Sequence, residues 1–277
     1  MMKIFKLTVG QPDFPVTVTV YQPAAIADFN QSPRWPLVIL LPGGGYRFYS
    51  DREKEVVALQ YLAAGYAVAI VAYRLVDQPP VYPAALYQLT HVVAEFHQHA
   101  TTYAIDAHRI LLVGFSAGGH LAALYADLWP QLAQTCRLPS ADCAVQALVL
   151  AYPVIGLRLG WPPDLMTRQA ISGTWDLTEA DQLVTSQNPP TFIWTTATDE
   201  LVPPQNAQAY VQALQHAGVP VAAHLYPHGP HALSLARFIT AFPAGATQEA
   251  TFGDRYVEPA VATWFATQLA WLHRVLG

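Results

Sequence analysis

Hydrophobic and polar residues follow two different patterns along the chain. Over residues 16–21 (VTVTVY) they alternate, as in a half-exposed antiparallel strand at the edge of a sheet. Further along, short runs are almost entirely apolar, which is typical of strands covered on both faces. These runs are Pro36–Leu41, Ala67–Tyr73, Arg109–Phe115, Ala147–Tyr152, Thr191–Thr196 and Val221–Tyr226. We therefore expect an opening hairpin followed by a series of buried strands.

Longer segments with helical character lie between the apolar runs. The predicted helices are Asp51–Ala64, Ala84–His99, Ala117–Leu128, Pro203–Ala217 and a terminal one near Glu258–Leu276. Gly65 and Gly218 directly follow the first and the fourth of them, where glycine commonly ends a helix. Because strands and helices alternate with short links, the pattern predicts an α/β fold with a mostly parallel sheet of about eight strands and helices on both faces.

One stretch, residues 152–187, has neither pattern. It holds several prolines together with Trp161 and Trp175, and its 36 residues are too many for an ordinary connection. We predict that it forms a small cap inserted over a functional site. The full length of 277 residues suits a single α/β domain, residues 1–277, that includes this insertion.

Composition and charge narrow the class of protein. Hydrophobic residues make up 53% of the chain and charged residues 12%, so a disordered protein is excluded. A net charge of −5 gives no reason to expect a nucleic-acid partner. We find no signal-like N-terminal segment and no apolar run long enough for a membrane span, so a cytoplasmic location is expected. Cys136 and Cys143 are then expected to be reduced, and their spacing is not that of a metal site.

The most specific pattern surrounds Ser116. The residues GFSAG (114–118) follow an apolar strand and open a predicted helix, which is the context of a G-x-S-x-G nucleophile elbow. In such a turn the serine is strained and its neighbours are small because strand and helix pack closely. The serine hydroxyl is then exposed at the helix N-terminus, where the amide of Ala117 can donate to an oxyanion. The alternative is an incidental glycine-rich turn.

A second glycine pattern follows an earlier strand. In LPGGGYRFY (41–49) three successive glycines allow the backbone to approach a substrate closely and to direct amides toward it. The alternative is a flexible loop. A dinucleotide-binding loop is disfavoured because the sequence has no G-x-G-x-x-G.

A nucleophilic serine needs a base, and the base needs a carboxylate that orients it. Asp199 comes just after a strand, where sites form in open α/β sheets, although it could instead cap the next helix. Asp176 and Asp254 are rival acids, but neither directly follows a strand. For the base, the segment after the last strand offers both His228 and His231.

These segments together resemble the α/β-hydrolase superfamily, and more closely the bacterial carboxylesterases and acetyl esterases of the hormone-sensitive-lipase-like and feruloyl-esterase-like groups. LPGGGY, GFSAGGHLA, TATDELVP and PHGPHALSL occur in the family's order with similar spacings. The resemblance implies that Ser116 is the nucleophile, that Asp199 orients the base and that His231 is the base. His231 precedes a small residue and an apolar run, as the family's histidine does, whereas His120 is expected to pack in the interior.

The resemblance also implies an oxyanion hole built from the amides of Gly44, Gly45 and Ala117. Many relatives have a histidine before these glycines, whereas this chain has Pro42. The difference leaves the glycine amides untouched and favours the acetyl-esterase-like branch.

The implied activity is hydrolysis of short-chain acyl esters through an acyl-serine, with no metal or cofactor. Tyr46, Trp161 and Trp175 are candidate substrate contacts. The alternatives are another hydrolase that uses the same triad (amidase, peptidase, thioesterase or lipase) and a non-catalytic binding protein. The expected partner is a small-molecule ester, and the oligomeric state, including a homo-oligomer, stays open.

Overall fold

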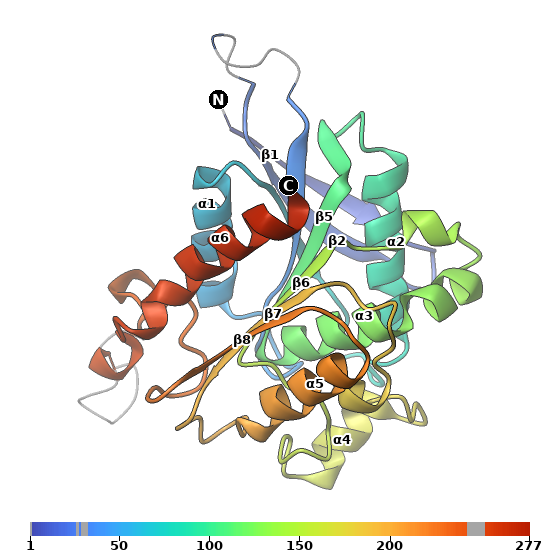
Figure 1. Ribbon diagram of the computed structural model, residues 1–277. Helices are drawn as coiled ribbons and strands as arrows, with labels where there is room; N and C mark the ends of the chain where they lie inside the picture. Colours follow the sequence, from blue (N-terminus) through green and yellow to red (C-terminus); the bar gives the residue numbers. More distant parts are fainter. Residues whose placement is uncertain (1, 26–27, 29–32, 243–252) are drawn as a thin grey trace.

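A computed structural model describes residues 2–25, 28, 33–242 and 253–277, and an eight-stranded sheet runs through its centre (Figure 1). The order across the sheet is β1-β2-β4-β3-β5-β6-β7-β8. The first two strands run antiparallel, and β4, β3, β5, β6, β7 and β8 are mutually parallel. The strands are β1 (Lys3–Val9), β2 (Val16–Gln22), β3 (Trp35–Leu41), β4 (Ala67–Ala72), β5 (Ile105–Phe115), β6 (Ala147–Ala151), β7 (Thr191–Thr196) and β8 (Val221–Tyr226). The predicted mostly parallel sheet is confirmed.

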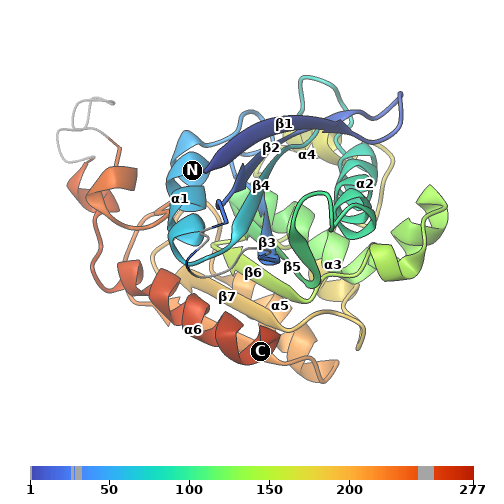
Figure 2. The ribbon, with the colours of Figure 1, turned by 90° about the horizontal axis from the view of Figure 1, so that it is seen from above.

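Helices cover both faces of this sheet, as predicted (Figure 2). One face carries α1 (Glu55–Ala63) and α6 (Trp264–Leu276), and the other carries α2 (Ala84–Gln98), α3 (Ser116–Cys136) and α5 (Gln205–His216). The sixth helix, α4 (Leu165–Ser172), lies within the segment 152–187. Each face therefore has its own hydrophobic core, separated from the other by the backbone of the sheet.

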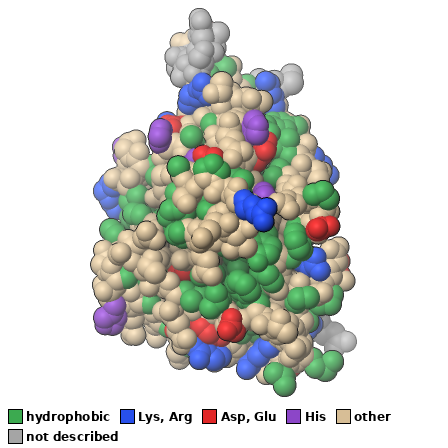
Figure 3. Space-filling model, turned by 90° about the vertical axis from the view of Figure 1, so that its right-hand side faces the viewer, with side chains coloured by type: hydrophobic (Ala, Val, Ile, Leu, Met, Phe, Trp, Pro, Cys, Tyr) green, Lys and Arg blue, Asp and Glu red, His purple; other side chains and the backbone are tan. Residues whose placement is uncertain are grey.

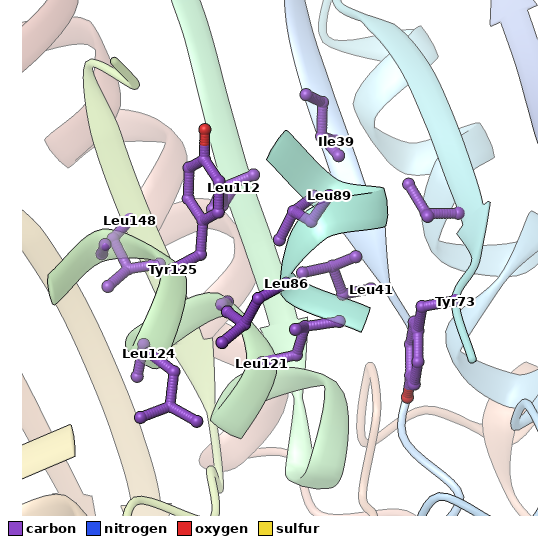
Figure 4. Close-up of a cluster of buried hydrophobic side chains, with 14 of the residues drawn as sticks. Ile39, Leu41, Tyr73, Leu86, Leu89, Leu112, Leu121, Leu124, Tyr125 and Leu148 are labelled. Carbon is purple, nitrogen blue, oxygen red and sulfur yellow. The ribbon is translucent and has the colours of Figure 1, made fainter. Parts of the chain in front are cut away.

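The larger core lies between the sheet and α2 and α3 (Figure 4). There Leu41 and Leu112 extend from β3 and β5 toward Leu86 of α2 and Leu121 of α3. All four side chains are fully buried. Burying a leucine contributes about 1.5–3 kcal/mol, so this layer fixes the position of α3 on the strand that precedes it.

Four predicted elements differ from the observed ones. Strand β2, expected at the edge of the sheet, lies between β1 and β4 because β1 pairs along its outer side, and α6 begins at Trp264 where a start near Glu258 was expected. Helix α3 continues to Cys136, past the predicted end at Leu128 and past Pro130, because Leu132 and Ala133 still pack into the interior. Strand β8 stands at the edge of the sheet and is half-exposed, where full burial was expected. Cys136 and Cys143 are both free thiols.

Charged residues make up only 12% of the chain. On the face shown in Figure 3, acidic and basic side chains of both signs are scattered among uncharged ones. Among the described residues, none of the helices combines the length and the hydropathy that a membrane span requires.

Candidate active site

The turn between β5 and α3 gives Ser116 a strained backbone with φ of 51°, which non-glycine residues rarely adopt. Its neighbours are glycines for steric reasons. A Cβ on Gly118 would lie 2.1 Å from the carbonyl oxygen of Leu41, and a Cβ on Gly114 would lie 2.6 Å from that of Gly118. Both distances are below any tolerated contact, so only glycine lets α3 begin this close to the end of β3. The strand–turn–helix geometry of a nucleophile elbow is therefore present.

Ser116, His231 and Asp199 form a continuous chain of hydrogen bonds. The Oγ atom of Ser116 lies 2.8 Å from Nε2 of His231, and Nδ1 of His231 lies 2.7 Å from Oδ2 of Asp199. All three side chains are buried. Ser116 is the first residue of α3, directly after β5, and Asp199 and His231 lie in the loops that follow β7 and β8. The parallel strands end at one edge of the sheet, which brings together residues far apart in sequence.

The surroundings of Asp199 fix the tautomer of His231. Oδ1 of Asp199 accepts hydrogen bonds from the amides of Leu201 (3.0 Å) and Val202 (2.9 Å), so the carboxylate is held from both sides. Its Oδ2 can only accept, so Nδ1 of His231 carries the proton that it donates there. Nε2 is then left without a proton and can accept one from the hydroxyl of Ser116. Helix α5 begins at Gln205, so Asp199 does not cap it.

The glycine loop after β3 directs two amides away from its own hydrogen bonds. The carbonyl of Gly43 accepts from the amide of Ser50 (3.0 Å), and the carbonyl of Gly44 accepts from the amide of Arg47 (3.0 Å). In a trans peptide the N–H points opposite to the C=O. The amides of Gly44 and Gly45 therefore point to the other side of the loop, and both residues line the cavity that contains Ser116.

This cavity has a volume of about 800 Å³, within the usual range for small-molecule sites. One wall is formed by the glycine loop and by the segment 152–187. The residues that this segment contributes are Trp161, Pro162, Pro163, Asp164 and Thr167. Trp161 lies directly against Gly45, since a Cβ placed there would be 3.4 Å from its ring. Within the described part of the chain, no three His, Cys, Asp or Glu side chains gather closely enough to hold a metal ion.

Two of the three candidate substrate contacts lie elsewhere. Tyr46 is fully buried behind the glycine loop, where its hydroxyl bonds to the hydroxyl of Tyr82 (2.5 Å) and to Nδ1 of His120 (2.9 Å). Trp175 is half-buried and donates to the carbonyl of Leu177. Neither residue lines the cavity, so the prediction that they contact substrate is wrong for both. Of the three candidates, only Trp161 lines the cavity.

The rivals that the structure describes, Asp176 and His228, do not join the hydrogen-bond chain. Asp176 is exposed, and the side chain of Asp254 lies outside the described part of the structure. His228 is exposed on the loop that carries His231. His120 packs in the interior as expected, where burial lowers its pKa to about 4 and its Nε2 lies 2.8 Å from the carbonyl oxygen of Thr178.

Sequence analysis missed two polar residues beside this site, Glu53 and Tyr152. Glu53 is buried at the cavity wall, and it accepts a hydrogen bond from the amide of Gly43 (2.8 Å). Tyr152 directly follows β6 and donates to Glu53 (2.6 Å), and its ring packs edge-on against that of His231. The one sequence signal for Tyr152 was its place at the end of a predicted strand.

The strand order, the elbow and the hydrogen-bond chain from Ser116 to Asp199 together define an α/β-hydrolase. The protein belongs to the BD-FAE family, whose model matches residues 20–214. The resemblance found in the sequence to α/β-hydrolase carboxylesterases is thereby confirmed.

Similarity to individual proteins supports this assignment. The crystal structure of the carboxylesterase Cest-2923 from Lactobacillus plantarum WCFS1 is 35% identical, and the alignment covers 99% of this chain and 98% of that one with a TM-score of 0.91. Endo-1,4-beta-xylanase B of Butyrivibrio fibrisolvens is 27% identical over 75% of this chain. Esterase LipQ of Mycobacterium tuberculosis is 26% identical over 76%. The matches span only 34% of the xylanase and 53% of LipQ.

Proposed function

We propose that the protein is a serine carboxylesterase that hydrolyses short-chain acyl esters through an acyl-enzyme on Ser116. The observation that carries the proposal is the hydrogen-bond chain Ser116–His231–Asp199 in the wall of a cavity, with the tautomer of His231 set for proton acceptance. The carboxylesterase relative, which is similar over nearly its whole length, supports the choice of esters as substrates.

In the proposed reaction, Ser116 attacks the ester carbonyl while Nε2 of His231 takes the hydroxyl proton. Asp199 holds the imidazole in place and stabilises its positive charge. His231 then gives the proton to the departing alcohol, which leaves an acyl-serine. Water attacks this ester with His231 again as the base, and release of the carboxylic acid restores the free hydroxyl of Ser116.

We assign stabilisation of the negative charge that develops on the carbonyl oxygen to the amides of Gly44, Gly45 and Ala117. The first two point away from the hydrogen bonds made by their own loop, and the third lies in the first turn of α3, where amides have no partner within the helix. Removal of one such donor typically costs about 10²–10³ in kcat, so this hole supplies a large share of the rate enhancement.

Labelling and substitution of Ser116 test the proposal. A serine-directed organophosphate should modify Ser116 with a stoichiometry of one, and Ser116→Ala should lower kcat by about 10⁴-fold or more with the fold intact. Modification of a different serine, or an alanine variant of near-normal activity, would rule out the mechanism.

The choice of base is tested separately. His231→Ala should abolish turnover, whereas His228→Ala should leave kcat unchanged because His228 lies outside the cavity and the hydrogen-bond chain. The reverse result would reassign the base.

A panel of aryl esters of graded acyl length, run beside acetylated sugars, anilides and thioesters, separates esterases from the other hydrolases that use the same triad.

Four further expectations stay predictions from the sequence. They are the cytoplasmic location, the lack of a nucleic-acid partner, the cap role of residues 152–187 and a homo-oligomeric state.

A further inference from the structure

A buried carboxylate adjoins the proposed catalytic groups without belonging to the triad. The side chain of Glu53 is 1% exposed, and both of its oxygens accept hydrogen bonds. Oε2 accepts from the amide of Gly43 at 2.8 Å, and Oε1 accepts from the hydroxyl of Tyr152 at 2.6 Å. Isolated buried carboxylates are costly, so a position of this kind calls for a role that an apolar residue could not fill.

The hydroxyl of Tyr152 extends the connection to the loop that carries His231. It accepts a hydrogen bond from the amide of Ser234 at 3.0 Å while it donates to Glu53. The Tyr152 ring packs edge-on against the imidazole of His231, with 5.0 Å between ring centroids. Ser234 is fully buried with φ of 53°, so the backbone of this loop is strained and needs such an anchor.

At its other end, the connection reaches the nucleophile. Gly43 is packed so tightly that a Cβ on it would lie 2.9 Å from Cβ of Ser116. Glu53 holds the N–H of Gly43, and with it the peptide plane before this residue, whereas the amide of Ser50 holds the C=O of Gly43, and with it the plane after this residue. The peptide plane that follows, which carries the N–H of Gly44, is therefore held in one orientation relative to Ser116.

On the basis of the proposed function, we propose that Glu53 and Tyr152 form a positioning pair. The pair holds the glycine loop after β3 and the loop of the catalytic histidine at fixed positions relative to Ser116. Neither residue transfers a proton. Glu53 holds the peptide plane before Gly43 and thereby limits rotation of the next plane, which carries the N–H of Gly44, and Tyr152 sets the place of the His231 ring. Because their shared hydrogen bond joins the two loops, displacement of one loop is opposed by the other.

The hydrogen bonds indicate that Glu53 is ionised, since each oxygen faces a donor. Burial raises the pKa of Glu53 above its usual range, and the bonds from Tyr152 and Gly43 together with the nearby Arg52 and His231 offset only part of this rise. A neutral amide at this position can accept only through its single oxygen. Glu53→Gln therefore keeps the size of the side chain and loses one of the two connections.

Three variants, Glu53→Gln, Glu53→Ala and Tyr152→Phe, test the pair by steady-state kinetics on an acetyl aryl ester. A misplaced catalytic group costs up to about 10²-fold, so we expect kcat to fall about 10-fold in Glu53→Gln and Tyr152→Phe and about 10²-fold in Glu53→Ala. KM should change less than about threefold, because binding of the planar ester does not need the oriented amides. The double variant Glu53→Gln/Tyr152→Phe should lose less than the product of the single losses.

A transition-state analogue separates positioning from general stability. Oγ of Ser116 adds to the carbonyl carbon of a short-chain trifluoromethyl ketone while its proton passes to Nε2 of His231, which leaves a negative oxygen in the proposed hole. Its inhibition constant should rise in each variant by the same factor by which kcat/KM falls.

The matched control is Asp127→Asn. Asp127 is also a buried carboxylate, bonded to Asn188 (2.5 Å) and to the hydroxyl of Tyr210 (2.8 Å), but it lies away from the cavity. Both bonds end on Oδ1, which asparagine retains, so Asp127→Asn replaces a buried carboxyl group without breaking either bond and should leave kcat and the inhibition constant unchanged. If Glu53→Gln and Tyr152→Phe behave like Asp127→Asn, the pair is structural only and the inference is wrong. An inactive wild-type enzyme, or an active Ser116→Ala variant, would instead overturn the proposed function.

Discussion

Nε2 of His231 lies 2.8 Å from Oγ of Ser116, although 115 positions separate the two residues in the chain. The short distance exists because β5 and β8 are parallel strands of one sheet, so helix α3 after β5 and the loop after β8 begin at the same edge. Burial of both side chains strengthens the hydrogen bond relative to one in water. The contact requires the tautomer of His231 that its hydrogen bond to Asp199 selects, and the first prediction tests this requirement.

Asp199→Asn should lower kcat by about 10⁴-fold without unfolding the protein. The amides of Leu201 and Val202 require an oxygen at the Oδ1 position, so the new NH₂ group must face Nδ1 of His231. Nδ1 then has to accept, and the proton moves to Nε2, which can no longer take one from Ser116. Steady-state kinetics and circular dichroism measure the two parts of the prediction. Asp176→Asn, at the exposed rival position, is the control and should keep normal activity.

The enzyme should prefer acyl chains of two to four carbons. Trp161 lies against Gly45, and with Pro162 and Pro163 it narrows the cavity beside the proposed oxyanion hole. We expect the volume of about 800 Å³ to be shared between the acyl group and the alcohol. A long apolar groove would add roughly 0.8 kcal/mol for each methylene, so kcat/KM would rise steadily with chain length. Octanoyl esters that react as fast as acetyl esters would contradict a short acyl pocket.

The buried His120 should make the fold less stable in acid. Burial lowers its folded-state pKa to about 4, whereas a histidine in an unfolded chain has a pKa near 6.5. Between these values the unfolded chain binds the extra proton, so the free energy of unfolding falls as pH drops through this range, by about 3 kcal/mol in all.

His120→Gln isolates this effect, because glutamine can donate to the carbonyl of Thr178 and accept from Tyr46 without titrating. Urea unfolding at pH 7.5 and pH 4.5 should show that the wild type loses about 2–3 kcal/mol more than the variant. Equal losses in the two proteins would show that His120 does not contribute to the acid sensitivity.

Gly118→Ala should destabilise the protein by more than about 4 kcal/mol, since the new Cβ would lie 2.1 Å from a carbonyl oxygen of the sheet backbone. Gly65→Ala is the control, because its Cβ would enter open space and the substitution costs only the strain of φ at 86°, about 1–3 kcal/mol. Chemical denaturation measures both changes. If Gly118→Ala is no worse than Gly65→Ala, close packing at the elbow is not what requires glycine.

The three residues of the hydrogen-bond chain could be predicted from the sequence because each lies at or shortly after the end of a predicted strand, and parallel strands bring such positions together. The directions in which loop side chains point could not be predicted from the sequence. The φ of 61° at Tyr46 turns that ring inward, away from the cavity that its neighbour Gly45 lines. Glu53 was missed for a related reason. In the sequence it is one of several charged residues at the start of a predicted helix, and its burial arises only when the loop 43–50 folds over it.

The proposed active site is completed by two late segments of the chain, the loop after β8 and helix α6. The loop that carries His231 follows β8, and its Ser234 carbonyl accepts a hydrogen bond from the indole of Trp264 in the C-terminal helix. A ribosome-bound chain that has exposed the elbow and Asp199 therefore still lacks its base. Return of esterase activity after dilution from denaturant would accordingly report the docking of the His231 loop against the C-terminal helix.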